Sequence, residues 1–280
     1  GNASDMSGND HHGTAENSSA TTDRHGNANQ AWNFVSNVNS RVVIPSTSDL
    51  TFSNAFTISL WAKFNEPWGF YVENLIWKFP HPGAQSGDGF SISVNQDNSS
   101  YGTGNYSFGF NASASGISTG HIIDFTTLSQ WFQLTGVYSA GTAHLYIDGT
   151  LIDTDTGSAT LVNSDHEIYL GGAQHPVSGA YDRNIDEVRF YDRALSATEV
   201  AALYTLENAP PNQAPVFAES NATYTTAENN ASASFLVTAT DPDANATLVY
   251  AKSGPDAGKF TLNVATGTLT FTNTPDFEAN

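Results

Sequence analysis

The sequence predicts an all-β protein, because short runs of alternating apolar and polar residues recur along the chain, separated by clusters of Gly, Asn, Asp and Ser. Phe56, Ile58 and Leu60 alternate with smaller residues, and segments 90–94 and 106–110 repeat the pattern. Side chains two positions apart on a strand point to the same face, so each run would present one apolar face to a core. Half-buried strands of this kind are typical of a sandwich or barrel.

One tight turn and one helix interrupt this pattern. Asp148-Gly149 lies between two strand-like runs, and Asp-Gly readily adopts the positive φ angles of a two-residue hairpin turn. Ser196 and Glu199 have the spacing of a capping box, which predicts a helix that ends before Pro210. We therefore predict a first domain at 1–206, a linker at 207–214 and a second domain at 215–280.

The charge composition excludes some partners. The chain has 28 acidic and 9 basic residues, a formal net charge of −19. Such a surface repels nucleic acid, whose binding requires Lys and Arg at the phosphates, and it attracts cations. Acidity alone fits equally well a surface that only keeps the protein in solution.

The absence of certain residues and segments excludes further kinds of site and of membrane association. The chain has no cysteine, which rules out disulfides, thiolate metal sites and cysteine nucleophiles. No apolar run approaches 18 residues, so direct membrane insertion is not expected. The first thirty residues are polar, and we expect any export signal to lie upstream or to have been removed.

Four short motifs follow one another in the first domain. They are D-M-S-G-N with H-G-T at Asp5–Asn9 and His12–Thr14, F-T-I-S-L-W at Phe56–Trp61, L-Y-I-D-G at Leu145–Gly149, and I-D-E-V-R-F-Y with R-A-L-S at Ile185–Tyr191 and Arg193–Ser196. In order and spacing they resemble the bacterial branch of the laminin G-like, concanavalin A-like family. The resemblance implies a jelly-roll β-sandwich over residues 1–206.

A second set of motifs follows the linker. It consists of Ala214–Phe217, Ala227–Asn229, Asp241–Asp243, Phe260 with Thr266-Gly267, and Asp276–Glu278. These motifs resemble a bacterial cadherin-like repeat, which is an Ig-like β-sandwich and occurs in large bacterial surface adhesins. The resemblance implies that the repeat is truncated at its C-terminus, with its last strands missing.

Both resemblances imply calcium, a hard cation that takes six to eight oxygen ligands. In the first domain the opening loop would lie beside the closing strand, so that Asp5, Asn9, His12 and Asp186 share one Ca²⁺ ion. The alternative is that Asp5 and Asn9 form an Asx-type turn and Asp186 caps a neighbouring loop. In the second domain the implied ligands are Glu228, Asp241, Asp243, Asp276 and Glu278, and the alternative is a solvated acidic end.

An organic ligand would bind at loops of the sandwich. Exposed aromatic side chains stack on sugar rings, and polar side chains bond the hydroxyls. The candidate residues are Trp68, Tyr71, His81, Asp88, Gln174, His175 and Tyr181. Trp61 and Trp77 fall inside strand patterns, which favours core positions for them.

Sandwiches of this shape also occur in glycoside hydrolases and polysaccharide lyases, yet we expect no catalysis. A retaining hydrolase needs two carboxylates about 5 Å apart. Asp186 and Glu187 are adjacent, so on a regular strand they would point to opposite faces. Asp165 and Glu167 would share a face, but no acid two residues beyond Glu167 completes the usual hydrolase spacing.

The sequence therefore favours a calcium-dependent binding or adhesion module of a secreted or surface-exposed bacterial protein. Its partners would be a glycan or peptide on a cell or matrix surface and the adjacent domains of a longer chain. Two alternatives stay open: a carbohydrate-binding module attached to a secreted polysaccharide-degrading enzyme, and a calcium-stiffened spacer without an organic ligand.

Overall fold

The computed structural model describes residues 3–35, 40–52, 54–64, 73–78, 89–96, 105–112, 117–124, 129–157, 165–171, 182–230, 232–243, 246–276 and 278. The chain forms two compact units, Gly1–Ala209 and Pro210–Asn280. The division falls inside the predicted linker. Within the described ranges, no helix is both long and apolar enough to span a membrane.

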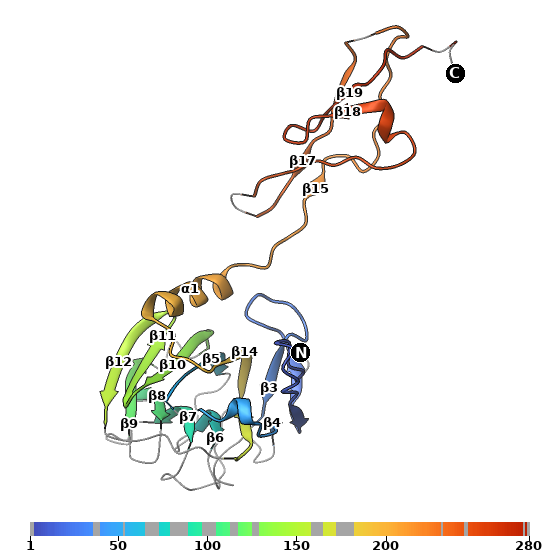
Figure 1. Ribbon diagram of the computed structural model, residues 1–280. Coiled ribbons are helices and arrows are strands. Elements are labelled where there is room, and N and C mark those ends of the chain that lie inside the picture. The colour runs from blue at the N-terminus through green and yellow to red at the C-terminus, as the bar shows by residue number, and fades with distance from the viewer. Residues whose placement is uncertain are drawn as a thin grey trace. The chain divides into compact units, whose positions relative to one another are not determined.

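The first unit is a sandwich of two seven-stranded antiparallel sheets (Figure 1). In sheet order, the first consists of β1 (Thr14–Glu16), β4 (Arg41–Ile44), β13 (Ile168–Gly171), β6 (Glu73–Lys78), β7 (Phe90–Gln96), β8 (Asn105–Ala112) and β9 (Ile117–Asp124). The second consists of β12 (Thr150–Thr156), β11 (Thr142–Ile147), β10 (Phe132–Ser139), β5 (Ala55–Phe64), β14 (Arg183–Tyr191), β3 (Ala31–Phe34) and β2 (Ser19–Thr21). The predicted all-β sandwich is confirmed.

The core lies between the two sheets, as the alternation in the sequence predicted. Phe56, Ile58 and Leu60 on β5 are fully buried, and so are Phe108 and Phe110 on β8. The ring of Phe56 packs edge-on against Phe110 of the opposite sheet, with 6.0 Å between ring centroids. Burial of such aromatic side chains supplies most of the stabilisation of a sandwich.

The last strand residue of β13 shows how tightly this core is closed. Gly171 has a φ of +64°, in the left-handed region that favours glycine. A Cβ atom at this position would lie 2.3 Å from the Phe34 ring on the opposite sheet. Glycine is therefore required at position 171 both by the backbone conformation and by the approach of Phe34.

The predicted hairpin and helix are both confirmed. Asp148 and Gly149 have φ angles of +48° and +74° and join β11 to β12. Helix α1 (Ala197–Asn208) begins after Ser196, and Ser196 and Glu199 form the reciprocal bonds of a capping box. A short 3-10 helix, η1 (Ser48–Leu50), precedes β5.

Helix α1 covers the outer face of the second sheet (Figure 1). Its buried residues Val200 and Leu203 form a second apolar cluster with Val137, Tyr146 and Leu195. The ring of Tyr204 stacks on Trp61, which is 2% exposed. Trp77 is 4% exposed, so both tryptophans predicted to be core residues are buried.

The second unit contains two small antiparallel sheets. One pairs β15 (Val216–Phe217) with β17 (Ala239–Thr240). The other has the order β16 (Ser234–Leu236), β19 (Thr268–Phe271), β18 (Phe260–Leu262). The 3-10 helix η3 (Ala257–Lys259) comes directly before β18 in the chain. Phe271 packs against Phe235 and Phe260, with ring centroids 5.7 and 4.9 Å away. These three partly buried rings pack together on the second of these sheets.

Candidate functional site

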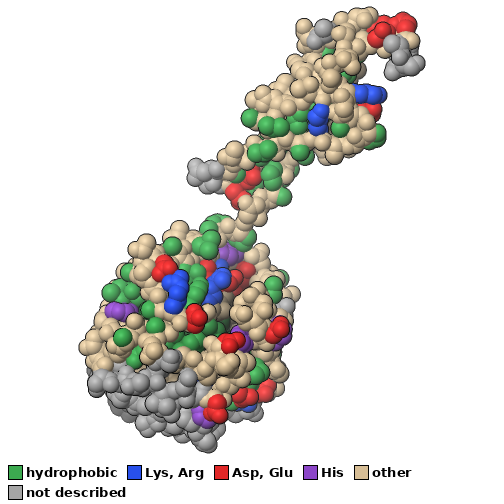
Figure 2. Space-filling view, viewed as in Figure 1, with side chains coloured by type: hydrophobic (Ala, Val, Ile, Leu, Met, Phe, Trp, Pro, Cys, Tyr) green, Lys and Arg blue, Asp and Glu red, His purple; other side chains and the backbone are tan. Residues whose placement is uncertain are grey.

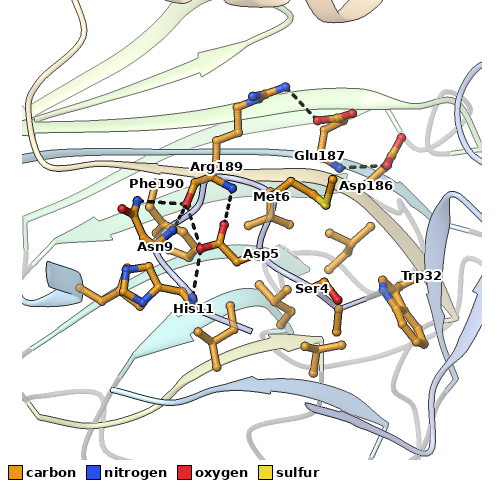
Figure 3. A pocket seen from close by; sticks show the side chains of 18 of the residues that line it. Ser4, Asp5, Met6, Asn9, His11, Trp32, Asp186, Glu187, Arg189 and Phe190 are labelled. Carbon is orange, nitrogen blue, oxygen red and sulfur yellow. Dashed lines mark hydrogen bonds and ion pairs between the residues drawn. The ribbon is translucent and has the colours of Figure 1, made fainter. Parts of the chain in front are cut away.

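A cavity of about 790 Å³ lies in the first unit between the N-terminal segment and strand β14 (Figure 3). Strands β3 and β14 of one sheet and β4 and β13 of the other contribute to its walls. It is lined by Ala3, Ser4, Asp5, Met6, Ser7, Asn9, His11, Gln30, Trp32, Phe34, Val42, Ile44, Asp49, Leu50, Phe52, Leu170 and Ile185–Asp192. Its size is within the range of sites for small organic ligands.

The cavity has an apolar interior and a polar rim. Core residues such as Phe34, Val42 and Ile185 form the interior and are at most 2% exposed. Asn9, Asp49 and other polar residues with exposed side chains surround it. Met6 also belongs to the rim and is 88% exposed, which is unusual for a large apolar side chain. An apolar interior with a few polar groups around it is the usual construction of a ligand site.

Strand β14 reaches the cavity through a bulge. The pairing of β14 with β5 shifts between Asp186 and Arg189, and Glu187 has a φ of +47°. The regular alternation expected for Asp186 and Glu187 is broken at this point, and both residues line the cavity. Bulges often re-aim side chains next to functional sites, because the extra residue changes the direction of the strand.

The N-terminal segment folds around the carboxylate of Asp5. Its Oδ1 accepts the backbone N–H of Ser7 (2.8 Å), and its Oδ2 accepts the Ser7 hydroxyl (2.8 Å) and the backbone N–H of His11 (3.0 Å). The bonds from Ser7, and then the one from His11, lower the pKa of Asp5 to about 2. Asn9 donates its side-chain amide to the Ser7 hydroxyl, and His12 Nδ1 accepts the backbone N–H of Asp5.

The carboxylate of Asp186 has different partners. Its Oδ2 lies 2.6 Å from a terminal guanidinium nitrogen of Arg24, and its Oδ1 accepts the backbone N–H of Glu187 (3.0 Å). Burial raises the pKa of Asp186 to about 6, although the charge of Arg24 lowers it. Figure 3 shows that the carboxylates of Asp5 and Asp186 do not point toward each other.

The four predicted calcium ligands of the sandwich are therefore not gathered into one group. Asp5, Asn9 and Asp186 line the same cavity, whereas His12 does not. Asp5 forms the Asx turn that the sequence left as an alternative, and Asp186 is ion-paired. Calcium binding by these residues stays a prediction.

A buried polar network behind Asp186 was not foreseen from the sequence. The Glu207 carboxylate at the end of α1 accepts the Trp61 indole N–H (2.7 Å), the Gln133 amide (2.7 Å) and the Arg189 guanidinium. Its backbone carbonyl accepts Nε and a terminal nitrogen of Arg24. Arg24 also lies over the Trp61 ring, 4.8 Å from its centre. Arg24 and Arg189 are thus both bound by Glu207 of the helix.

Trp32, on β3, is a second residue that the sequence analysis did not single out. Its indole nitrogen is buried and has no hydrogen-bond partner within the described part of the chain. In Figure 3 the nitrogen edge of Trp32 faces the other residues of the cavity. A buried N–H without an acceptor is costly, so it marks a position where a ligand oxygen would be stabilised. Trp32 lies two residues before Phe34 in an alternating strand pattern, and this pattern alone does not show that its N–H is unpaired.

The second unit gathers three of its five predicted calcium ligands. Oxygen atoms of Glu228, Asp276 and Glu278 lie within 4.8 Å of one another, and all three residues are exposed. Asp241 and Asp243 belong to a different turn: Asp241 Oδ1 accepts the backbone N–H of Asp243 (2.9 Å). The predicted organic-ligand residues Trp68, Tyr71, His81, Asp88, Gln174, His175 and Tyr181 lie outside the described residues.

A family model for the concanavalin A-like lectin/glucanases superfamily, of the laminin G type, matches residues 36–201. The chain belongs to this superfamily. A model for a bacterial Ig domain matches residues 212–280, so the lectin/glucanase-like sandwich is followed by an Ig-like unit. Both family matches confirm the predicted order of folds. A search of the curated proteins gave no match.

Solved structures similar to this superfamily domain include several toxin binding domains. The binding domain of Paraclostridial Mosquitocidal Protein 1 superposes with a TM-score of 0.55 at 20% identity, over 73% of this chain and 49% of that one. The ligand binding domain of botulinum neurotoxin serotype D, in complex with N-acetylneuraminic acid, gives a TM-score of 0.53 at 14% identity, over 73% and 48% of the two chains. The chain spans about half the length of these domains, and the likeness shows the shared fold.

Proposed function

We propose that this chain is a non-catalytic glycan-binding module of a secreted or surface-exposed bacterial protein. The observation that carries the proposal is the cavity, which combines an apolar interior, aromatic walls and an unpartnered Trp32 N–H. Aromatic and apolar surfaces bind the faces of sugar rings, while polar groups orient the hydroxyls. The sugar complex of a domain with the same fold supports the proposal at the level of architecture.

The arrangement of the carboxylates at the cavity supports binding rather than hydrolysis. Asp186 and Glu187 are each ion-paired, to Arg24 and Arg189 respectively, with N···O distances of 2.6 and 2.9 Å. A glycoside hydrolase needs one protonated and one ionised carboxyl group placed on either side of the scissile bond. Two carboxylates committed to arginine partners are poorly suited to these roles.

Trp32→Phe tests the site. Phenylalanine keeps an aromatic wall but removes the N–H donor, so we expect about tenfold weaker binding of glycans that an array identifies for the unmodified chain. The loss of the unpaired donor offsets part of the lost packing, so the urea midpoint should change little. Trp131→Phe, outside the cavity lining, is the matched control. Equal glycan affinity for both variants would remove Trp32 from the site.

We also propose that calcium binds the acidic group of the second unit. Three carboxylates within 4.8 Å repel one another, and a divalent cation relieves this repulsion. Calorimetry on protein treated with EDTA should show heat of calcium binding, and the double variant Asp276→Asn/Glu278→Gln should lose the part due to this group. Glu219→Gln, a single acid in the same unit, is the control. Identical calcium titrations of the double variant and the unmodified protein would refute this site.

A further inference from the structure

We infer that the cavity selects uncharged or cationic sugars and rejects anionic ones, an inference that rests on the glycan-binding function proposed above. The first observation is the charge of the lining. Five acidic residues line the cavity: Asp5, Asp49, Asp186, Glu187 and Asp192. Arg189 is the only Lys or Arg among the described lining residues. The whole chain adds to this field with its net charge of −19.

The second observation concerns the arginines. Proteins commonly bind carboxylates and other anions through bidentate hydrogen bonds from an arginine guanidinium. Arg189 gives its Nε to the Glu207 carboxylate and a terminal nitrogen to Glu187 (2.9 Å). Arg24 gives one terminal nitrogen to Asp186 and its other two nitrogens to the Glu207 carbonyl. All three nitrogens of Arg24 are thus bonded within the protein, and two of the three nitrogens of Arg189 already bind carboxylates.

The third observation is that acceptors remain at the rim. Asp49 has a side chain that is 71% exposed, and Asp192 is also exposed. On the face in Figure 2, acidic side chains are spread over the region where Figure 1 places the N-terminal segment and strands β3 and β4. Exposed carboxylates accept hydrogen bonds from sugar hydroxyls and attract an ammonium group, but they repel a carboxylate or sulfate.

The three observations together assign the charge of the ligand. An anionic sugar entering the cavity would meet carboxylates at the rim, and the one arginine among the described lining residues is already paired with two carboxylates. A neutral sugar would find hydrogen-bond acceptors for its hydroxyl groups. The ammonium group of an amino sugar would also be attracted by the negative potential of the rim carboxylates. Asp49 and Asp192 are the specificity-determining residues in this account, because their carboxylates are exposed beside the cavity.

The test uses the full chain and matched pairs of oligosaccharides that differ in charge. Suitable pairs are lactose with 3′-sialyllactose, N-acetylglucosamine trimer with glucosamine trimer, and methyl-esterified with free oligogalacturonate, alongside a broad glycan array. In the lactose and oligogalacturonate pairs we expect the anionic member to bind more weakly than its neutral partner, and in the remaining pair we expect the cationic glucosamine trimer to bind at least as well as the neutral trimer. Raising the salt concentration should narrow these differences, since salt screens exposed charges.

A double variant, Asp49→Asn/Asp192→Asn, tests the named residues. It should reduce the discrimination against the anionic member by about fivefold for each carboxylate removed, the effect of one unit charge at about 4 Å in water. The control is Asp153→Asn/Asp155→Asn on β12, which changes the net charge equally but is separated from β14 by the three strands β11, β10 and β5 of the same sheet.

The outcomes separate the two proposals. A preference for the anionic member of these pairs, or equal effects of the two double variants, would overturn the charge selectivity and leave glycan binding intact. Absence of binding to every glycan on the array would overturn the proposed function, and the selectivity with it.

Discussion

Glu207→Ala is expected to lower the free energy of unfolding of the first unit by about 2–6 kcal/mol, because it leaves the two buried donors of Trp61 and Gln133 without an acceptor, at about 1–3 kcal/mol each. Glu207 is 4% exposed, and its carboxylate is the acceptor for Trp61, Gln133 and Arg189. Removing it leaves these donors without an acceptor on the covered face of the second sheet. All five tryptophans precede residue 210, so tryptophan fluorescence in urea reports on this unit alone.

Two further variants define the cause of this loss. Leu206 is 73% exposed on the same helix, so Leu206→Ala should change the free energy of unfolding by about 0.5 kcal/mol or less. Glu207→Gln should be nearly as harmful as the alanine variant, because its three side-chain partners are all donors and an amide offers them only one oxygen. A Glu207→Ala midpoint equal to that of Leu206→Ala would contradict a stabilising role for the network.

Gly171→Ala is expected to destabilise the first unit by about 2–5 kcal/mol. The left-handed φ of +64° contributes about 1–2 kcal/mol of strain for a non-glycine residue, and overpacking a core adds about 1–3 kcal/mol. The new methyl group would meet the ring of Phe34, which is fully buried and lines the cavity. The same urea titration measures the effect.

Gly26→Ala separates the two contributions. Gly26 also has a positive φ, +88°, but a Cβ there meets no atom within 4 Å. It should therefore show the backbone strain alone, and the difference between the two variants measures the clash with Phe34. Equal destabilisation by both substitutions would mean that the approach of Phe34 contributes nothing.

Local patterns in the sequence were sufficient to predict the frame of the sandwich. The alternation around Ile58, the Asp148-Gly149 turn and the Ser196 capping box each depend on residues within a few positions, and each was found as predicted. Such features follow from backbone geometry and local hydrogen bonding, which a sequence displays directly.

The candidate site depends on pairings that no local pattern reveals. Arg24 and Glu207 are 183 positions apart, and their contact exists only once the β2–β3 loop meets the end of α1. The bulge at Glu187 breaks the alternation that its strand otherwise follows. The pairing of Asp186 with Arg24 could not be derived either, because the sequence gives no reason to prefer an internal cation over a metal ion at that carboxylate.

The contact between the β2–β3 loop and the carbonyl of Glu207 has a consequence for biosynthesis. Arg24 is synthesised early, but its acceptor is among the last residues of the first unit to leave the ribosome. Until then Trp61 and Gln133 also lack the Glu207 carboxylate, and the outer face of the second sheet stays uncovered. The nascent sandwich therefore completes its fold only when the end of α1 has left the ribosome, at the time when the Ig-like unit begins to emerge.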